Sequence, residues 1–180
     1  MSDKLEIATL ANGCFWCTEA IFQRLNGVEK VTSGYSGGKV KNPSYREVTT
    51  GETGHAEVIQ IQFNPSVITF QEILDVFFST HDPTTLNKQG YDVGTQYRSA
   101  IFYHSKEQKE TAEKFIKALT EAKVFENKIV TEVTPFDAFY SAEEYHQNYY
   151  NNNKNQGYCV AVINPKLEKF IKKYKNKLKK

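Results

Sequence analysis

Two hydrophobic patterns are interleaved along the whole chain, and together they limit the folds that it can adopt. In one pattern apolar and polar residues alternate, and in the other apolar residues recur every three or four positions. The first is typical of half-buried strands and the second of amphipathic helices. Extended segments are predicted over residues 5–10, 56–63, 100–103, 129–133 and 158–163, and helices over 14–26, 69–78, 105–119, 141–149 and from Pro165 onward. The chain is therefore predicted to be one α+β domain with a modest sheet.

Capping patterns support three of these helices. In each, a serine or threonine precedes a glutamate or glutamine by three residues, at 69 and 72, 105 and 108, and 141 and 144. Such pairs satisfy the free N–H groups of a first helical turn. Two polar, glycine-bearing loops over residues 34–54 and 81–97 separate the elements, and loops of this length are usually functional.

The length and composition suit a single globular unit. A chain of 180 residues can bury a core without disulfide bonds, and no apolar run is long enough to cross a bilayer. We expect residues 1–165 to form the domain and residues 166–180, with eight lysines and one glutamate, to form a helix or tail. Three cysteines are too few for a disulfide scaffold, and no leader segment is seen, so a cytoplasmic location is expected.

Cys14 lies where the first strand meets the first helix. Free N–H groups and the positive end of the helix dipole at this point are expected to lower the pKa of a thiol. A thiol of this kind is a good nucleophile near neutral pH. The alternative is a buried structural cysteine, since cysteine packs as a small apolar residue.

Cys17 follows Cys14 in a C-x-x-C spacing, which occurs in redox dithiols and in zinc sites. A zinc site would need more ligands, and Cys159 is the only other thiol. The four histidines are scattered without a metal-binding spacing. No bound metal is expected.

Glu57 shares one face of its predicted strand with Ile59, Ile61 and Phe63. Burial would raise the pKa of its carboxyl group and keep it protonated, as a general acid requires. The alternative is that Glu57 lies beyond the buried part of the strand and is solvated. The rings of Phe15 and Trp16 either form an apolar substrate pocket beside Cys14 or join the core.

Several blocks of sequence together resemble the peptide methionine sulfoxide reductase A family. The blocks are Gly13-Cys14-Phe15-Trp16, residues 34–38, 42–48 and 51–57, His81-Asp82-Pro83, residues 94–100 and Gly157-Tyr158-Cys159. They cover nearly the whole chain in family order.

The resemblance implies a fold, an activity and a set of roles. The fold would be a two-layer ferredoxin-like plait with a mixed sheet, long active-site loops and a C-terminal arm. Methionine S-sulfoxide, free or in peptides, would be reduced without a bound cofactor, and thioredoxin or another dithiol would restore the enzyme. Cys14 would be the nucleophile, forming a sulfenic acid and then a disulfide, and Glu57 the acid. Tyr45 and Tyr97 would assist Glu57, Asp92 would help to hold a water, and Phe15 and Trp16 would bind the methyl group.

The chain departs from the family pattern at Cys17, where most members have glycine, so two thiols could resolve the sulfenic acid. We favour Cys159, in an asparagine-rich stretch that could swing to Cys14, with Cys17 as a relay or a bystander. A thiol–disulfide oxidoreductase acting on proteins is the alternative enzyme. The lysine-rich tail could bind nucleic acid or an anionic surface, but it more often docks on the domain. A monomer is expected.

Overall fold

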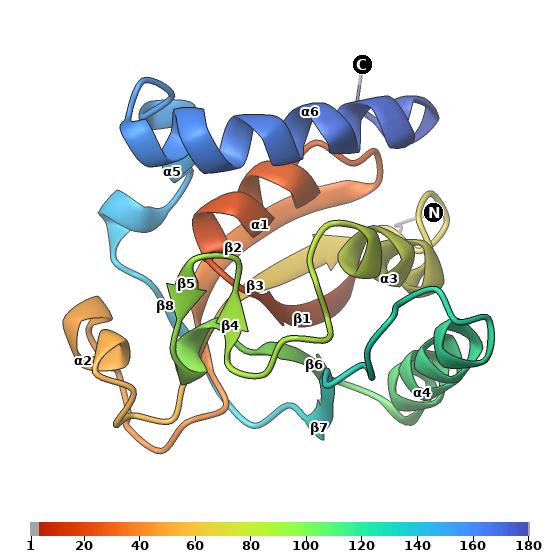
Figure 1. Ribbon diagram of the computed structural model, residues 1–180, viewed down its shortest axis with the longest axis horizontal. Coiled ribbons are helices and arrows are strands. Elements are labelled where there is room, and N and C mark those ends of the chain that lie inside the picture. Colours follow the sequence, from red (N-terminus) through yellow and green to blue (C-terminus); the bar gives the residue numbers. More distant parts are fainter. Residues whose placement is uncertain (1–3, 180) are drawn as a thin grey trace.

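Residues 4–179 are described by a computed structural model, which shows an α+β fold built on a curled sheet (Figure 1). The sheet has the order β7-β6-β1-β3-β2-β8. Only the β6–β7 pair is parallel, so the sheet is mixed and the α+β class is confirmed. The six strands are β1 (Glu6–Asn12), β2 (Val28–Ser36), β3 (Ala56–Phe63), β6 (Ser99–Tyr103), β7 (Glu132–Pro135) and β8 (Phe139–Ser141).

The helices pack largely on one face of the sheet, and in Figure 1 α6 crosses α1 at the top of the view while α3 and α4 lie at the right. Their ranges are α1 (Phe15–Phe22), α2 (Tyr45–Thr49), α3 (Phe70–Ser79), α4 (Lys106–Glu121), α5 (Tyr149–Asn152) and α6 (Asn164–Lys173). Alternate residues of β3, Ile59, Ile61 and Phe63, belong to the core under these helices, while Val58 belongs to a smaller cluster on the opposite face. This alternation places Glu57 on the helix-covered face.

The structure differs from the prediction before and within the first long loop and at the edges of the sheet. Strand β2 was not predicted, because only one of its first five residues, Val28, is buried and its polar residues hide the alternation. The predicted strand over 129–133 begins at Glu132 instead. The second loop contains a short hairpin of β4 (Lys88–Gln89) and β5 (Asp92–Val93) and a 3₁₀ turn over Thr95–Tyr97.

The predicted helix over 141–149 is wrong. Ser141 ends β8, and a 3₁₀ turn over Glu144–His146 leads to a left-handed Asn148, with φ of 55°, and then to α5. The side chain of Gln147 explains this path, because it accepts from the Ser33 N–H at 3.0 Å and donates to the Ser33 carbonyl at 2.8 Å. Tertiary hydrogen bonds have replaced those that a helix would have made.

The segment over 158–163 is not extended, as predicted, but helical. Cys159–Ile163 forms a π-helical turn that continues directly into α6, with Pro165 in the first turn of that helix. Proline is compatible with this position because a first-turn N–H has no helical partner. Cys159 and Ile163 consequently point into the core and are fully buried.

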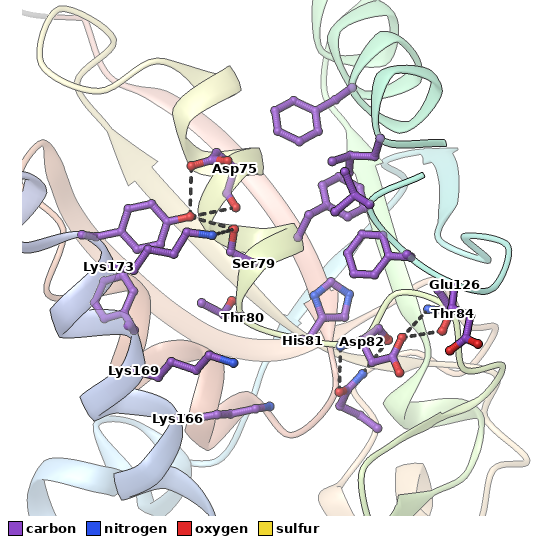
Figure 2. A pocket seen from close by; sticks show the side chains of 18 of the residues that line it. Asp75, Ser79, Thr80, His81, Asp82, Thr84, Glu126, Lys166, Lys169 and Lys173 are labelled. Carbon is purple, nitrogen blue, oxygen red and sulfur yellow. Dashed lines mark hydrogen bonds between the residues drawn. The ribbon is translucent and has the colours of Figure 1, made fainter. Parts of the chain in front are cut away.

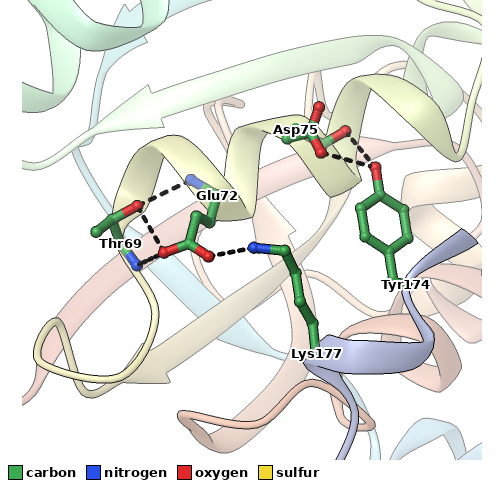
Figure 3. Close-up of polar contacts among 5 residues, drawn as sticks. All are labelled: Thr69, Glu72, Asp75, Tyr174 and Lys177. Atoms are coloured by element: carbon green, nitrogen blue, oxygen red, sulfur yellow. Dashed lines mark hydrogen bonds and ion pairs between the residues drawn. The ribbon is translucent and has the colours of Figure 1, made fainter.

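The C-terminal arm docks on the domain through polar and apolar contacts (Figure 3). Phe170 and Tyr174 are buried, and Leu178 forms a β-bridge with Leu25. The hydroxyl of Tyr174 donates to Asp75 of α3 at 3.0 Å, and Lys177 forms an ion pair with Glu72. Of the helices within residues 4–179, none is both long and apolar enough for a membrane crossing.

Candidate functional site

Cys14 occupies the N-cap position of α1, directly after β1, as the sequence predicts. Its carbonyl accepts the N–H of Cys17 at 3.1 Å, which starts the helix, and its own side chain is partly buried. Gly13 permits the turn, since its φ is 103° and a Cβ there would lie 2.8 Å from the side chain of Gln89. The β4–β5 hairpin therefore closes tightly over the turn that carries Cys14.

Glu57 lies beneath this turn, at the start of β3, and is 1% exposed. Its Oε1 accepts the Phe15 N–H at 3.1 Å, whereas Oε2 is buried and has no hydrogen-bond partner among the described residues. Burial, and secondarily the charge of Asp92, raises the pKa of Glu57 to about 8 despite the Phe15 N–H. The structure therefore buries Glu57 rather than leaving it solvated, and its role as the acid stays a prediction.

The expectation of a lowered pKa at Cys14 is wrong. Burial is the main cause that raises the pKa of Cys14, and the Cys17 thiol and the charge of Glu57 raise it further. The same thiol–thiol contact lowers the pKa of Cys17. Desolvation therefore changes the pKa of Cys14 more than the positive end of the helix dipole does. The extent of desolvation depends on packing, which cannot be recognised from the neighbouring residues in the sequence.

Tyr45, Asp92 and Tyr97 come from α2, β5 and the adjoining 3₁₀ turn, and the structure brings them around Glu57. Burial and the charge of Glu57 raise the pKa of Tyr45 to about 12 and raise that of Tyr97 as well. Both phenols therefore remain protonated donors. Asp92 accepts from the Tyr158 hydroxyl at 2.8 Å.

Phe15 and Trp16 play different structural parts. Phe15 is 1% exposed, and its ring packs near those of Tyr35 and Tyr45, at centroid distances of 5.7 and 6.4 Å. Trp16 is only partly buried, and it stacks on Tyr149 at 3.8 Å with an interplanar angle of 9°. Of the pair, Trp16 lies nearer the surface, with its ring fixed by the stack.

His146, Tyr149 and Tyr158 surround Trp16, and none of them was predicted as a site residue, because they lie in segments predicted as helix and strand. The indole N–H of Trp16 donates to His146 Nδ1 at 2.9 Å, so Nε2 of the neutral ring carries the proton. That Nε2 is buried and lacks a hydrogen-bond partner within residues 4–179. Burial also lowers the pKa of His146.

Two acids, the buried Glu19 and the partly buried Glu143, hold the loop that carries His146 and Tyr149. Glu19 of α1 accepts the N–H groups of Asn148 and Tyr149 at 3.0 and 3.3 Å. Glu143 accepts the Tyr35 hydroxyl and the Tyr45 N–H, both at 2.9 Å. The loop over 142–149 is thus attached both to α1 and to the start of α2.

The three thiols are free and lie close enough to influence one another's pKa values. Cys14 contacts Cys17, and the charge of Cys17 contributes to raising the pKa of Cys159. Cys17 also lies 3.8 Å from the Tyr158 hydroxyl, next to Cys159 in the chain. Cys159 itself is fully buried.

The described residues of this site do not form a metal centre, and the cavity between α3, α4 and α6 lies outside it. No group of three or more His, Cys, Asp or Glu side chains that could hold a metal ion occurs in the part of the chain that the structure describes. A cavity of about 670 Å³ lies between α3, α4 and α6, and none of the predicted site residues lines it (Figure 2).

Comparisons with known proteins agree with the geometry. The sequence profile of the family described as peptide methionine sulfoxide reductase matches residues 6–179. The chain is 60% identical to a peptide methionine sulfoxide reductase MsrA of Sulfolobus acidocaldarius, covering 96% of this chain and 97% of that protein. Mxr1 of Saccharomyces cerevisiae in reduced form superposes with a TM-score of 0.81 at 41% identity, covering 87% and 90% of the two chains. Mxr1 in complex with Trx2 gives a TM-score of 0.58 at 33% identity, covering 83% and 87%.

Proposed function

The chain belongs to the peptide methionine sulfoxide reductase family, and from this we propose that it reduces methionine sulfoxide, free and in peptides, with Cys14 as the nucleophile. The observation that carries the assignment is the carboxyl group of Glu57. One of its oxygens is fixed by the first N–H of α1, next to Cys14, while the other is buried and has no hydrogen-bond partner within residues 4–179. A sulfoxide oxygen placed against that second oxygen would supply the missing hydrogen bond.

The raised pKa values of Cys14 and Glu57 mean that both groups are protonated before the reaction and can exchange a proton during it. Near pH 7 both groups hold their protons, so the empty site buries no charge on either. In the reaction the sulfur of Cys14 attacks the sulfoxide sulfur as Glu57 protonates the departing oxygen. The thiol proton passes to the Glu57 carboxylate, which leaves an intermediate with a bond between the two sulfur atoms and a hydroxyl group on the substrate sulfur. That bond then breaks, its electron pair stays with methionine, and the hydroxyl group passes to the Cys14 sulfur as a sulfenic acid.

The neighbouring phenols and rings would orient the substrate. Tyr45 and Tyr97 keep their protons and can donate hydrogen bonds to the oxygen as negative charge develops on it. Trp16, held by Tyr149, and Phe15 would take the methyl group. If the oxygen lies at Glu57 and the methyl group at Trp16, only one configuration at the sulfoxide sulfur lets Cys14 approach that atom. We propose that this configuration is the S epimer. Asp92 would hold a water through the network that includes Tyr158.

The order of thiol exchange proposed here begins with Cys17 rather than Cys159. Cys17 already contacts Cys14, has a lowered pKa and needs no movement of the buried Cys159 segment. Its thiolate attacks the Cys14 sulfenic acid and releases water. Cys159 can then attack Cys17 and free Cys14, leaving a Cys17–Cys159 disulfide for an external dithiol protein of the thioredoxin type. The Mxr1–Trx2 neighbour supports such a reductant.

A single-turnover experiment tests both reaction and order. Fully reduced protein is mixed with one equivalent of a methionine S-sulfoxide peptide, and disulfides are mapped by mass spectrometry over time. We expect one equivalent of methionine, an early Cys14–Cys17 bond and a later Cys17–Cys159 bond. The Cys159→Ser variant should stop at the first bond. A direct Cys14–Cys159 bond in Cys17→Ser at the wild-type rate would restore the order favoured from sequence, and no methionine at all would refute the reductase.

The finer architecture is part of the same proposal. We assign β1, α1, β2, β3, α3 and β6 to a ferredoxin-like plait, supported by their antiparallel order β6-β1-β3-β2. Residues 1–165 would form the reductase domain and 166–180 an arm docked on it. Three free thiols fit a reducing compartment such as the cytoplasm. We propose a monomer, because Cys14, Glu57 and their neighbours all come from one chain.

A further inference from the structure

A second candidate binding site is the cavity between α3, α4 and α6, close to the turn that carries Cys14, which we call the catalytic turn (Figure 2). Its volume is about 670 Å³, and its apolar lining includes Phe78, Phe115, Phe125 and Phe170. It is a groove rather than a gap in packing, because charged side chains of α6 line one wall and a polar turn after α3 lines another.

The wall formed by α6 carries three lysines, Lys166, Lys169 and Lys173, on one helix face. Within residues 4–179, none of them lies within 4.0 Å of a carboxylate oxygen, although Lys173 donates to Ser79 at 2.9 Å. Lys166 and Lys169 therefore bring positive charge to the groove without an ion-pair partner.

The acids that line the groove do not cancel this charge locally. Asp75 accepts the Tyr174 hydroxyl at 3.0 Å. Asp82 accepts the Thr84 N–H at 2.9 Å and also its hydroxyl. Both carboxylates are thus hydrogen-bonded within the protein, and Glu126 is exposed at the far side from α6. The charges are separated between the walls, because the three lysines lie on α6 and the acids lie elsewhere, and within residues 4–179 none of these acids forms an ion pair either.

The groove reaches the catalytic turn at one end. Gln89 lines it, and the same side chain lies against Gly13, next to Cys14. Lys166 also lines it and is close enough to Cys17 for its charge to lower the pKa of that thiol. A polypeptide whose methionine sulfoxide is at Cys14 would need to extend only past the β4–β5 hairpin to enter the groove.

We propose that this groove binds the flanking residues of an oxidised polypeptide, with acidic side chains on Lys166 and Lys169 and apolar ones on the aromatic floor. The inference rests on the proposed function, because it extends the substrate of the same site. All three cysteines are free in this structure, so the groove is already formed in the state that meets the sulfoxide. The dithiol reductant, in contrast, binds the enzyme after a disulfide has formed. The groove seen in the reduced state is therefore better explained by binding of the substrate than by binding of the reductant.

Matched peptides give the test. Three peptides carry one methionine S-sulfoxide flanked by aspartates, serines or lysines, and each is assayed at low salt beside free methionine S-sulfoxide. The wild type should prefer the aspartate peptide over the lysine peptide by about 5- to 10-fold in kcat/KM, as expected for one or two exposed charge pairs. The preference should disappear in 0.5 M salt.

Two charge reversals on the same helix separate the groove from the general field of the tail. Lys169→Glu should remove or invert the aspartate preference, whereas Lys172→Glu, which is exposed and does not line the groove, should keep it. Turnover of free methionine S-sulfoxide should stay the same in both variants. An equal effect of the two charge reversals, or no preference for the aspartate peptide in the wild type, would overturn the proposal that the groove binds the flanking residues.

Two further outcomes are distinguishable. If Lys169→Glu changes only the KM for the dithiol reductant, the groove serves that protein and our inference is wrong. If free methionine S-sulfoxide is not reduced by the wild type, the proposed function fails, whatever the peptides show.

Discussion

Two carboxyl groups on the same side of the sheet, Glu57 and Glu72, are held in opposite ways. Glu57 is 1% exposed, one of its oxygens has no partner among the described residues, and burial raises its pKa to about 8. Glu72, at the start of α3, is more than a third exposed and bonds to Lys177 and Thr69 (Figure 3). Its pKa is lowered, chiefly by Lys177.

The difference separates chemistry from stability. A buried acid with a free oxygen costs the fold free energy, and it persists where function uses it. A carboxylate that completes a capping box and an ion pair contributes modestly to stability and is not prepared to transfer a proton. The catalytic turn and the C-terminal arm can therefore be perturbed independently.

The largest expected effect is on catalysis at Glu57. Glu57→Gln keeps the size of the side chain and can still accept the Phe15 N–H, but it cannot protonate the sulfoxide oxygen. We expect kcat to fall by about 10²- to 10⁴-fold. Turnover of a methionine S-sulfoxide peptide measures this, and Glu72→Gln is the matched control with unchanged kcat. A Glu57→Gln enzyme within threefold of the wild type would end the assignment of the acid.

The next effect is on stability, and its dependence on pH has opposite signs in the two regions. The folded pKa of Glu57, about 8, exceeds the ordinary value of 4.5, so the folded state loses stability as pH rises between them. Glu57→Gln should therefore gain stability relative to the wild type as pH rises from 5 to 8, by at most about 1.4 kcal/mol per unit. For Glu72, whose pKa is lowered, the contribution is present above the ordinary value and is lost in acid.

Urea unfolding of the wild type and the two variants at several pH values measures these slopes. Parallel curves for the wild type and Glu57→Gln between pH 5 and 8 would show that Glu57 has no raised pKa in the folded state.

Elements with strong local signals could be predicted from the sequence. The capping box of Thr69 and Glu72 forms, and α3 follows it with Ile73, Leu74 and Phe77 buried. The position of Cys14 at a strand–helix junction also follows from pattern alone, whereas the pattern left open whether Glu57 is buried or solvated. These features depend on residues close together in the chain.

Features set by contacts distant in sequence could not be predicted. The loop that carries His146 is shaped by Glu19 and by Gln147 on Ser33, so its capping pattern was misleading. The pKa of Cys14 depends on how deeply the thiol is packed and on Glu57, 43 positions away. Neither the path of this loop nor the pKa of Cys14 can be recognised from the neighbouring residues in the sequence.

A smaller catalytic effect is expected at Glu19, which holds the aromatic side of the site. Glu19→Gln replaces one acceptor oxygen by an amide donor that would face a backbone N–H of Asn148 or Tyr149. An unmade buried hydrogen bond of this kind costs about 1–3 kcal/mol. The stack of Tyr149 on Trp16 should loosen, and kcat/KM should fall about tenfold, mainly through KM.

Trp16 is the only tryptophan, so its fluorescence reports on this wall directly. The Glu19→Gln emission should shift and become more accessible to a soluble quencher, while the exposed Glu29→Gln control should match the wild type. A loss of activity with unchanged Trp16 emission would show that Glu19 acts by another route.

The smallest effect is expected at the arm. Glu72→Gln removes the charge that pairs with Lys177 but keeps an acceptor for the Thr69 N–H, so it tests the ion pair alone. Since both side chains are partly exposed, the free energy of unfolding should fall by about 0.5 kcal/mol and less in high salt. Lys177→Met should cost a similar amount, and the double variant should cost little more than either single one, because both remove one interaction. If instead the double variant loses methionine sulfoxide turnover, docking of the arm supports the Cys159 segment that precedes α6, and the two regions are coupled after all.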